Sequence, residues 1–244
     1  TGYEYDMTGN VIAATDARNI RTSYSWDAEG RLLSKTNSSV HNWQYNTTTG
    51  QLTGITDDSG STSWQYNTAG MLSSQTAVID GSNYTLDWAY DSYQRASSLT
   101  YPGGTKVEYQ YDAGNQLNAV TVTINGELFN LLSNITTLPF GPISGWQYGN
   151  GLNRNYSYDL NYRLTGISTP GIQQLAYSYS NSQISGISNL LDVSLSQSFN
   201  YDSLSRLTSA SSTANGQDNY NYDSLGNRLS RSGKVVESYD IDPL

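Results

Sequence analysis

The chain carries the phrase Tyr220-Asn-Tyr222-Asp223-Ser-Leu-Gly226-Asn227-Arg228-Leu229, and related phrases return about every 21 residues. Each phrase has two aromatic residues one position apart, then Asp or Asn, a short stretch that often contains Gly, and an aliphatic residue. Clear copies begin at Tyr3 and Tyr24, and looser copies centre on Tyr45, Tyr66, Tyr90, Tyr111, Tyr158, Tyr179 and Tyr201. A repeat of this length marks an array whose units stack on one another to bury an apolar face.

One repeat is predicted to be a β-hairpin. Aromatic residues at i and i+2 point to the same side of a strand, where Tyr and Trp are favoured. Asp at the first position of a turn and Gly at the fourth suit a type I turn that joins two strands. We therefore predict hairpin turns at Asp6–Gly9, Asp27–Gly30, Asn67–Gly70 and Asp223–Gly226.

An aliphatic residue after each turn is expected to pack across the hairpin against the aromatic pair. These residues are Leu32, Leu52, Leu72, Leu117, Leu164 and Leu207. Two strands and two turns fill one period, and no segment shows a helical period of 3.6 residues. The sequence thus predicts an all-β protein of tandem hairpins across residues 1–244, forming a curved, spiralling open sheet.

The composition narrows the classes of function. The formal charge is −9 with 12 basic residues, which argues against nucleic acid as a partner. There is no cysteine and no apolar run near 18 residues, so we expect no disulfide, no thiolate metal site and no membrane span. The chain begins and ends within repeats, and we interpret it as a piece of a longer array.

Residues 122–152 are expected to be an irregular corner, because the interval between repeats lengthens there to 37 and then shortens to 10. Asn125-Gly126 is a two-residue hairpin signal inside this segment. Pro139 and Pro142 cannot donate to a β-ladder and should mark a bend or an edge.

Two phrases carry a family resemblance. Leu138-Pro-Phe-Gly-Pro142 followed by Trp146-Gln-Tyr-Gly-Asn-Gly151, and Tyr101-Pro-Gly-Gly-Thr-Lys-Val-Glu-Tyr-Gln-Tyr-Asp112, resemble phrases of the Rhs (rearrangement hotspot), or YD-repeat, family. Departures are Asn46 and Asn67 in place of Asp, Gly149 after Tyr148, and Ser180 after Tyr179.

The resemblance covers essentially the whole chain and implies a role. The family includes bacterial polymorphic toxins of contact-dependent and type VI systems, insecticidal toxin complexes, wall-associated proteins and animal teneurins. Its toxins spiral their repeats into a hollow shell around a variable C-terminal toxin. The resemblance therefore implies a segment of such a shell, with the C-terminal toxin domain of its own chain as partner.

Catalytic and metal-binding chemistry finds little support in the residues. His41 is the only histidine and no Gly-x-Ser-x-Gly motif is present, so we expect no Ser-His-Asp site and no zinc site. Asp57-Asp58-Ser-Gly60 offers oxygen ligands but lacks the spaced acids of a calcium loop. Asp242-Pro243-Leu244 lacks the glycine-rich sequence of the family's self-cleavage motif. We predict no catalytic residue, no cofactor-binding residue and no metal ligand.

Three classes of function are open at this stage. The first is a structural shell segment of a secreted or injected toxin. The second is a cell-surface adhesion module whose aromatics bind a glycan or a protein, and the third is a glycan-active enzyme. Unpaired strand edges at the two ends predict edge-to-edge self-association, which Asp240, Asp242 and Pro243 would oppose at the C-terminal edge.

Overall fold

The computed structural model describes residues 2–139, 141–234 and 236–239. Within these residues it is an all-β structure of 23 strands with one 3₁₀ turn, η1 (Val193–Leu195), and no α-helix. The chain divides into two compact units, residues 1–110 with 121–129 and residues 111–120 with 130–244. The all-β prediction is confirmed. Asp240, Asp242, Pro243 and Leu244 lie outside the described residues.

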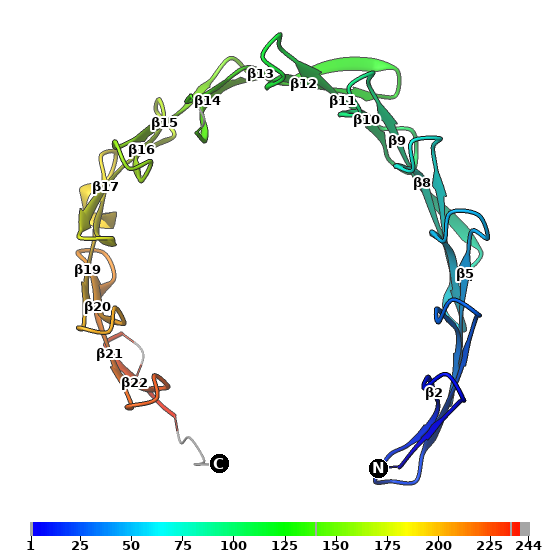
Figure 1. Ribbon diagram of the computed structural model, residues 1–244. Helices are drawn as coiled ribbons and strands as arrows, with labels where there is room; N and C mark the ends of the chain where they lie inside the picture. The colour runs from blue at the N-terminus through cyan, green and yellow to red at the C-terminus, as the bar shows by residue number, and fades with distance from the viewer. Residues whose placement is uncertain (1, 140, 235, 240–244) are drawn as a thin grey trace. The chain divides into compact units, whose positions relative to one another are not determined.

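The first eleven strands, except Tyr111 at the end of the last one, belong to the first unit, and Figure 1 draws them in blue to green. They are β1 (Gly2–Tyr5), β2 (Val11–Thr15), β3 (Arg21–Trp26), β4 (Leu32–Thr36), β5 (Val40–Tyr45), β6 (Leu52–Asp57), β7 (Gly60–Tyr66), β8 (Leu72–Ile79), β9 (Ser82–Tyr90), β10 (Ala96–Thr100) and β11 (Lys106–Tyr111).

Residues of both units contribute to the next two strands, and the second unit contains the remaining ones. They are β12 (Leu117–Ile124), β13 (Glu127–Thr137), β14 (Ile143–Tyr148), β15 (Asn153–Tyr158), β16 (Leu164–Thr169), β17 (Gln173–Ser180), β18 (Gln183–Asn189), β19 (Gln197–Tyr201), β20 (Leu207–Ser212), β21 (Gly216–Tyr222), β22 (Arg228–Ser232) and β23 (Glu237–Ser238).

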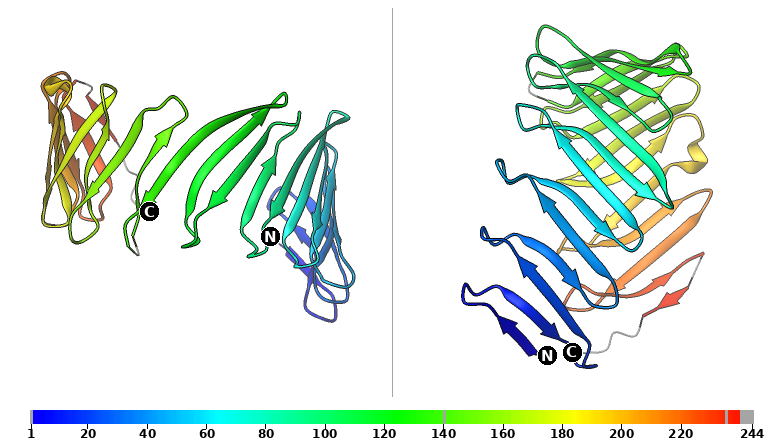
Figure 2. Two further views of the ribbon diagram at one scale, coloured as in Figure 1. Left: turned by 90° about the horizontal axis from the view of Figure 1, so that it is seen from above. Right: turned by 90° about the vertical axis from the view of Figure 1, so that its right-hand side faces the viewer.

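In each unit, consecutive strands pair antiparallel and lie side by side in a single layer (Figure 2). In both units the described strands contact the strands that are next to them in the sequence. No second layer packs on these strands. Burial is correspondingly shallow. Among the described residues no large side chain is fully buried, and the buried apolar residues are Ala13, Val120, Val122 and Ile135.

The repeat turns form as predicted. The amide of Gly9 donates to the carbonyl of Asp6 at 3.2 Å, and Gly226 donates to Asp223 at 3.3 Å; Gly30 and Gly70 do the same to Asp27 and Asn67. These glycines have φ between 70° and 95°, a region that side chains disfavour. All four predicted turns are confirmed.

A β-bulge follows the repeat turn in nine hairpins of the described chain. The second aromatic pairs with the first residue of the next strand, as in Tyr66↔Leu72, and the register then skips one residue. Such a bulge adds an unpaired residue and increases the local twist. The predicted pairing of aromatic with leucine is confirmed for Leu32, Leu52, Leu72, Leu164 and Leu207.

The irregular segment keeps the alternation of turns. Asn125 and Gly126 have positive φ and form the predicted tight turn between β12 and β13. Leu138 to Gly141 then occupies the place of a repeat turn, with the Gly141 amide donating to the Leu138 carbonyl at 2.9 Å. Phe140 lies outside the described residues.

One detail of the predicted repeat phrase is wrong. Tyr148–Gly151 joins β14 to β15 and alternates with the repeat turns, so Gly149 does not occupy the Asp position of a repeat. Ser180 occupies the Asp position after Tyr179, and the turn there is shortened to two residues, across which Ser180 pairs with Gln183. The spacing of aromatics misled at Gly149 because strand alternation, not aromatic spacing, fixes the edge on which a turn lies.

Candidate functional site: the aromatic face and the ties between repeats

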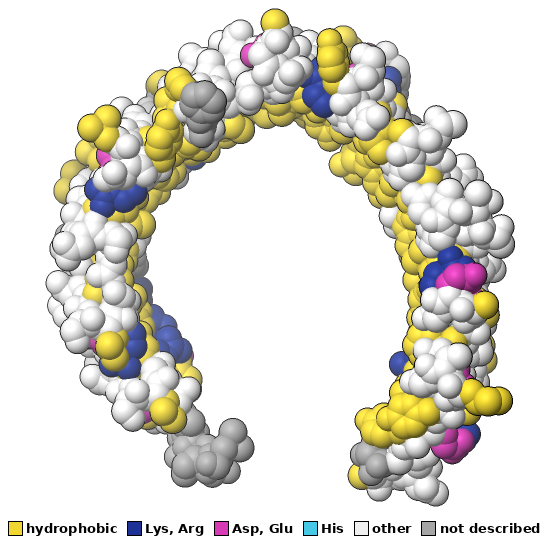
Figure 3. All heavy atoms as spheres, viewed as in Figure 1, with side chains coloured by type: hydrophobic (Ala, Val, Ile, Leu, Met, Phe, Trp, Pro, Cys, Tyr) yellow, Lys and Arg dark blue, Asp and Glu magenta, His cyan; other side chains and the backbone are white. Residues whose placement is uncertain are grey.

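One face of the sheet carries both aromatics of each repeat, and we call it the aromatic face. In β3 the half-buried Thr22, Tyr24 and Trp26 alternate with the exposed Ser23 and Ser25. Across the hairpin, Lys35 and Leu32 lie opposite Tyr24 and Trp26 on this same face. In each unit hydrophobic side chains gather on the concave side of the sheet (Figure 3).

Leu32, Leu72, Leu164 and Leu207 lie on the aromatic face as predicted, but they are only half-buried. They are not fully buried, because a single layer leaves each apolar side chain covered from the sides alone. The cost of removing one of them is therefore smaller than for a core leucine.

The second aromatic of a repeat is tied to the preceding repeat through its polar atom. The hydroxyl of Tyr66 donates to the carbonyl of Leu52 at 2.8 Å, and Leu52 is the residue that lies opposite the second aromatic of the repeat before. The same bond joins Tyr90 to Leu72, Tyr158 to Ile143, Tyr179 to Leu164, Tyr201 to Ile184 and Tyr222 to Leu207, at 2.7–2.9 Å. Trp26 donates its indole N–H to Val11 in the same way.

These acceptor carbonyls sit at the bulge, where the ladder is disturbed. The phenol thus supplies a donor to a partly buried carbonyl, and it joins one hairpin to the next. The bond from Tyr158 to Ile143 also shows that β14 is the second strand of a repeat, although that repeat lacks an aromatic pair.

Arginine provides a second tie. Arg206 donates Nε to Asp202 Oδ2 at 2.7 Å within its own turn, and its Nη1 donates to the carbonyl of Asp223 in the next turn at 2.8 Å. Its guanidinium also lies 4.9 Å from the ring centroid of Tyr222, within the range of a cation–π interaction. Arg163 makes the same contacts: it donates to Asp159 and to the Asn181 carbonyl, and its guanidinium lies over the ring of Tyr179. Arg31 donates to Asp27 and lies over the ring of Tyr45.

Two of the turn aspartates, Asp202 and Asp159, are held in their ionised form. Asp202 Oδ1 accepts the amides of Leu204 and Arg206 at 2.9 Å. The amide of Arg206, together with its side chain, lowers the pKa of Asp202 below its ordinary value. The Arg163 amide and side chain lower the pKa of Asp159 in the same way.

The opposite face is polar. Ser25 and Ser34 hydroxyls lie 2.6 Å apart across one hairpin, and Ser198 and Ser211 lie 2.8 Å apart across another. The residue after each bulge is small, and Ala13 there is only 1% exposed. Among the other small residues at this position are Ser34, Gly54, Ser74, Ser98, Gly166, Gly186, Ser209 and Ser230.

His41 lies half-exposed on the aromatic face. Its Nε2 is 3.0 Å from the Ser39 hydroxyl, and its Nδ1 is 3.5 Å from Asp57 Oδ2. The Ser39 amide donates to Asn37 Oδ1 and is not free to stabilise an oxyanion. Asp57 Oδ1 accepts both the amide and the hydroxyl of Ser59, so this carboxylate serves its own turn.

A search of the described residues for groups of three or more acidic, histidine or cysteine side chains able to hold a metal ion finds none. Among the described residues, no helix has the length and apolar character needed to cross a membrane.

The hairpins, the bulges and the ties between them define a class of protein: a single-layer array of YD-type β-hairpin repeats. The family model described as RHS Repeat matches residues 5–39 and 45–85. Over these residues the resemblance to the Rhs, or YD-repeat, family is confirmed.

Solved structures show the same fold. The chain is similar to the TcdB2–TccC3–Cdc42 complex at a TM-score of 0.67 and 21% identity, over 95% of this chain and 16% of that chain. The values for TcdB2–TccC3 without the hypervariable C-terminal region are the same. The Photorhabdus luminescens Tc holotoxin pore matches at 0.66 and 21%, over 94% of this chain and 15% of that one. No curated protein sequence matches the chain.

The chain thus spans about one sixth of the length of the solved chains that it matches.

Proposed function

We propose that this chain is a wall segment of an Rhs shell in a secreted or injected toxin, and that the complete protein encloses a C-terminal toxin domain. The observation that carries the proposal is the aromatic face. It is the apolar side of a single layer, and no described strand packs on it as a second layer. A face of this kind suits a wall that separates an interior from solvent.

The structural neighbours support the enclosed partner. One of them is described as lacking a hypervariable C-terminal region, so the intact protein carries such a region at its C-terminus. On the basis of the similarity to these solved structures, we propose that residues 1–244 act as one array with 122–152 as its irregular part. The wall has no catalytic, cofactor or metal site of its own, no nucleic-acid partner and no membrane span.

The test is protection of the downstream domain in the full-length protein. A protease is added to the full-length protein and, as a matched control, to the downstream domain alone. We expect the domain to survive at least tenfold longer within the full-length protein. Equal rates of cleavage in the two samples would contradict enclosure.

The alternative is an adhesion module, in which the same rows of Tyr and Trp bind a glycan or protein of another cell. In these rows the side chains of Tyr3 and Tyr5 are 57% and 58% exposed to solvent. The test measures whether the intact protein binds to cells. Loss of this binding when exposed aromatics are replaced would favour the alternative. Edge-to-edge association of the isolated chain is also proposed, and light scattering over a concentration series tests it.

A further inference from the structure

One position on the aromatic face departs from the repeat in the second unit. This position is the third residue after the aliphatic residue that follows each repeat turn. It lies across the hairpin from the first aromatic residue of the same repeat. Ile55, Leu99, Ile167 and Ile187 fill it in four repeats. Ala210 occupies it opposite Phe199. Because alanine leaves most of that volume empty, a hollow of about 290 Å³ opens over Ala210.

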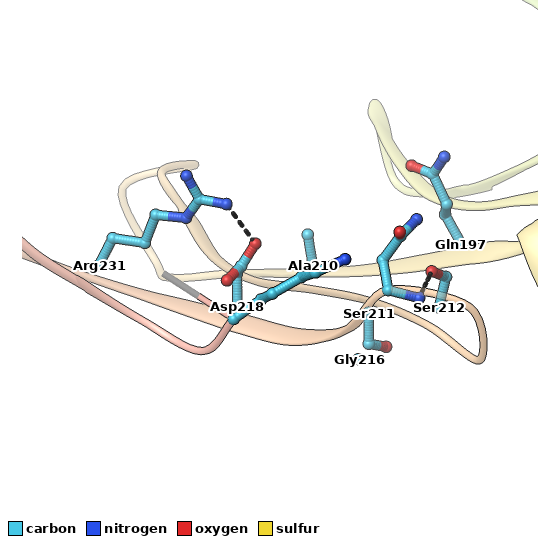
Figure 4. Close-up of a pocket in the computed structure, with 9 residues that line it drawn as sticks. Gln197, Ala210, Ser211, Ser212, Gly216, Asp218 and Arg231 are labelled. Carbon is cyan, nitrogen blue, oxygen red and sulfur yellow. Dashed lines mark hydrogen bonds and ion pairs between the residues drawn. The ribbon is translucent and has the colours of Figure 1, made fainter. Parts of the chain in front are cut away.

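Charged residues flank this hollow, whereas three other repeats are neutral at the matching place. On the following strand Asp218 lies opposite Ala210, whereas Thr62, Val107 and Leu175 lie opposite the residues at the same position in other repeats. Arg231 holds Asp218 with Nη2 at 2.8 Å from Oδ2. Figure 4 shows Ala210 between this ion pair and Gln197. A half-buried ion pair contributes little net stability, so the fold does not require it here.

The lining of the hollow is basic within an acidic chain. Arg231 and Lys234 against Asp218 leave one net positive charge, while the whole chain carries −9. Gly233 packs against Asp218, where a Cβ would lie 2.3 Å from Oδ1. Asp218 lines the hollow beside Arg231 and Lys234, so two cations and one carboxylate face a ligand there.

Neutral polar groups complete the lining. The side chains of Gln197 and Ser212 offer amide and hydroxyl groups, and Ser212 accepts the Asn215 amide at 3.1 Å. Amide and hydroxyl groups suit a ligand with many hydroxyl groups, and the cations suit an anion.

We propose that this hollow binds a sugar unit that carries a carboxylate, of the uronic acid class. The carboxylate meets Arg231 and Lys234, and the hydroxyls meet Gln197 and Ser212. The volume is at the lower limit of ligand pockets, which fits one sugar unit and not a longer chain within the hollow. This binding goes beyond the proposed role as a wall.

The experiment titrates the protein with glucuronate and follows binding by NMR or calorimetry. Ala210→Ile fills the hollow with the residue that Ile187 supplies in the preceding repeat, and should weaken binding at least tenfold while the chain stays folded. Ala14→Ile is the matched control, because Ala14 has the same place opposite Tyr3 without a charged pair beside it. It should leave binding unchanged.

Three further arms test the chemistry. Lys234 is exposed, so Lys234→Gln keeps the fold and should weaken glucuronate binding several-fold. Glucose and acetate should each bind at least tenfold more weakly than glucuronate. Acetate binding as well as glucuronate would overturn the sugar assignment, and glucose binding equally well would overturn the role of the charges. Undiminished binding by Ala210→Ile would overturn the site itself.

Discussion

Removal of a single phenol hydroxyl tests how the array is held together. Tyr179→Phe deletes the bond from Oη to the Leu164 carbonyl, whose length is 2.8 Å. The ring and its packing stay, and the carbonyl at the bulge loses its donor. A hydrogen bond of this kind contributes about 0.5–1.5 kcal/mol net, so the free energy of unfolding should fall by about 1 kcal/mol.

Tyr177→Phe is the matched control. Tyr177 is on the same strand and face, two residues earlier, and its hydroxyl has no hydrogen bond to any other described residue. It should stay within about 0.5 kcal/mol of the parent, as ordinary surface changes do. Urea unfolding of the parent and both variants makes the comparison. Equal losses for the two variants would refute the argument that the hydroxyl bond, and not the phenol itself, joins the repeats.

Three other predictions follow from the structure. Leu72→Ala should lower the free energy of unfolding by about 1–2 kcal/mol, less than for a core leucine, because Leu72 is half-buried; urea unfolding measures this. The pKa of Asp202 and of Asp159 is lowered in the folded chain, so both carboxylates stabilise it above the ordinary value of 3.8. That contribution is lost as the pH falls below about 4, and unfolding by urea at pH 7 and pH 3 should show a smaller drop for Asp202→Asn than for the parent. Gly149→Ala should destabilise the chain strongly, because the new Cβ would lie 1.8 Å from the Asn130 carbonyl oxygen; a melting temperature equal to that of the parent would contradict this.

The sequence predicts a large part of this fold because the repeat turn is a local structure. Asp6, Gly9 and the residues between them carry all the information that their turn needs. The pairing of Tyr66 with Leu72 follows equally well, since both residues belong to one hairpin. The half-burial of Leu72 did not follow, because burial depends on how many layers the sheet has, and alternation within a strand does not reveal that number.

The contacts between repeats could not be predicted from the sequence for a related reason. The bond from Tyr222 to the Leu207 carbonyl joins two hairpins, and its geometry depends on the bulge that shifts the register after Tyr201. The period alone places Tyr222 on the correct face and does not place its hydroxyl. The recurrence of Asp four residues before Arg, in Asp159–Arg163 and Asp202–Arg206, was a usable signal for the second tie.

The composition is explained by the same ties. The chain has 21 Tyr, 5 Trp and only 3 Phe, although all three side chains suit a strand. A protein with two packed layers gains its stability from burial, and phenylalanine serves there as well as tyrosine. In a single layer each hairpin must be held by its neighbours, as in other repeat proteins. Tyrosine and tryptophan cover the aromatic face and also carry the donor that reaches the preceding hairpin, whereas phenylalanine does only the first.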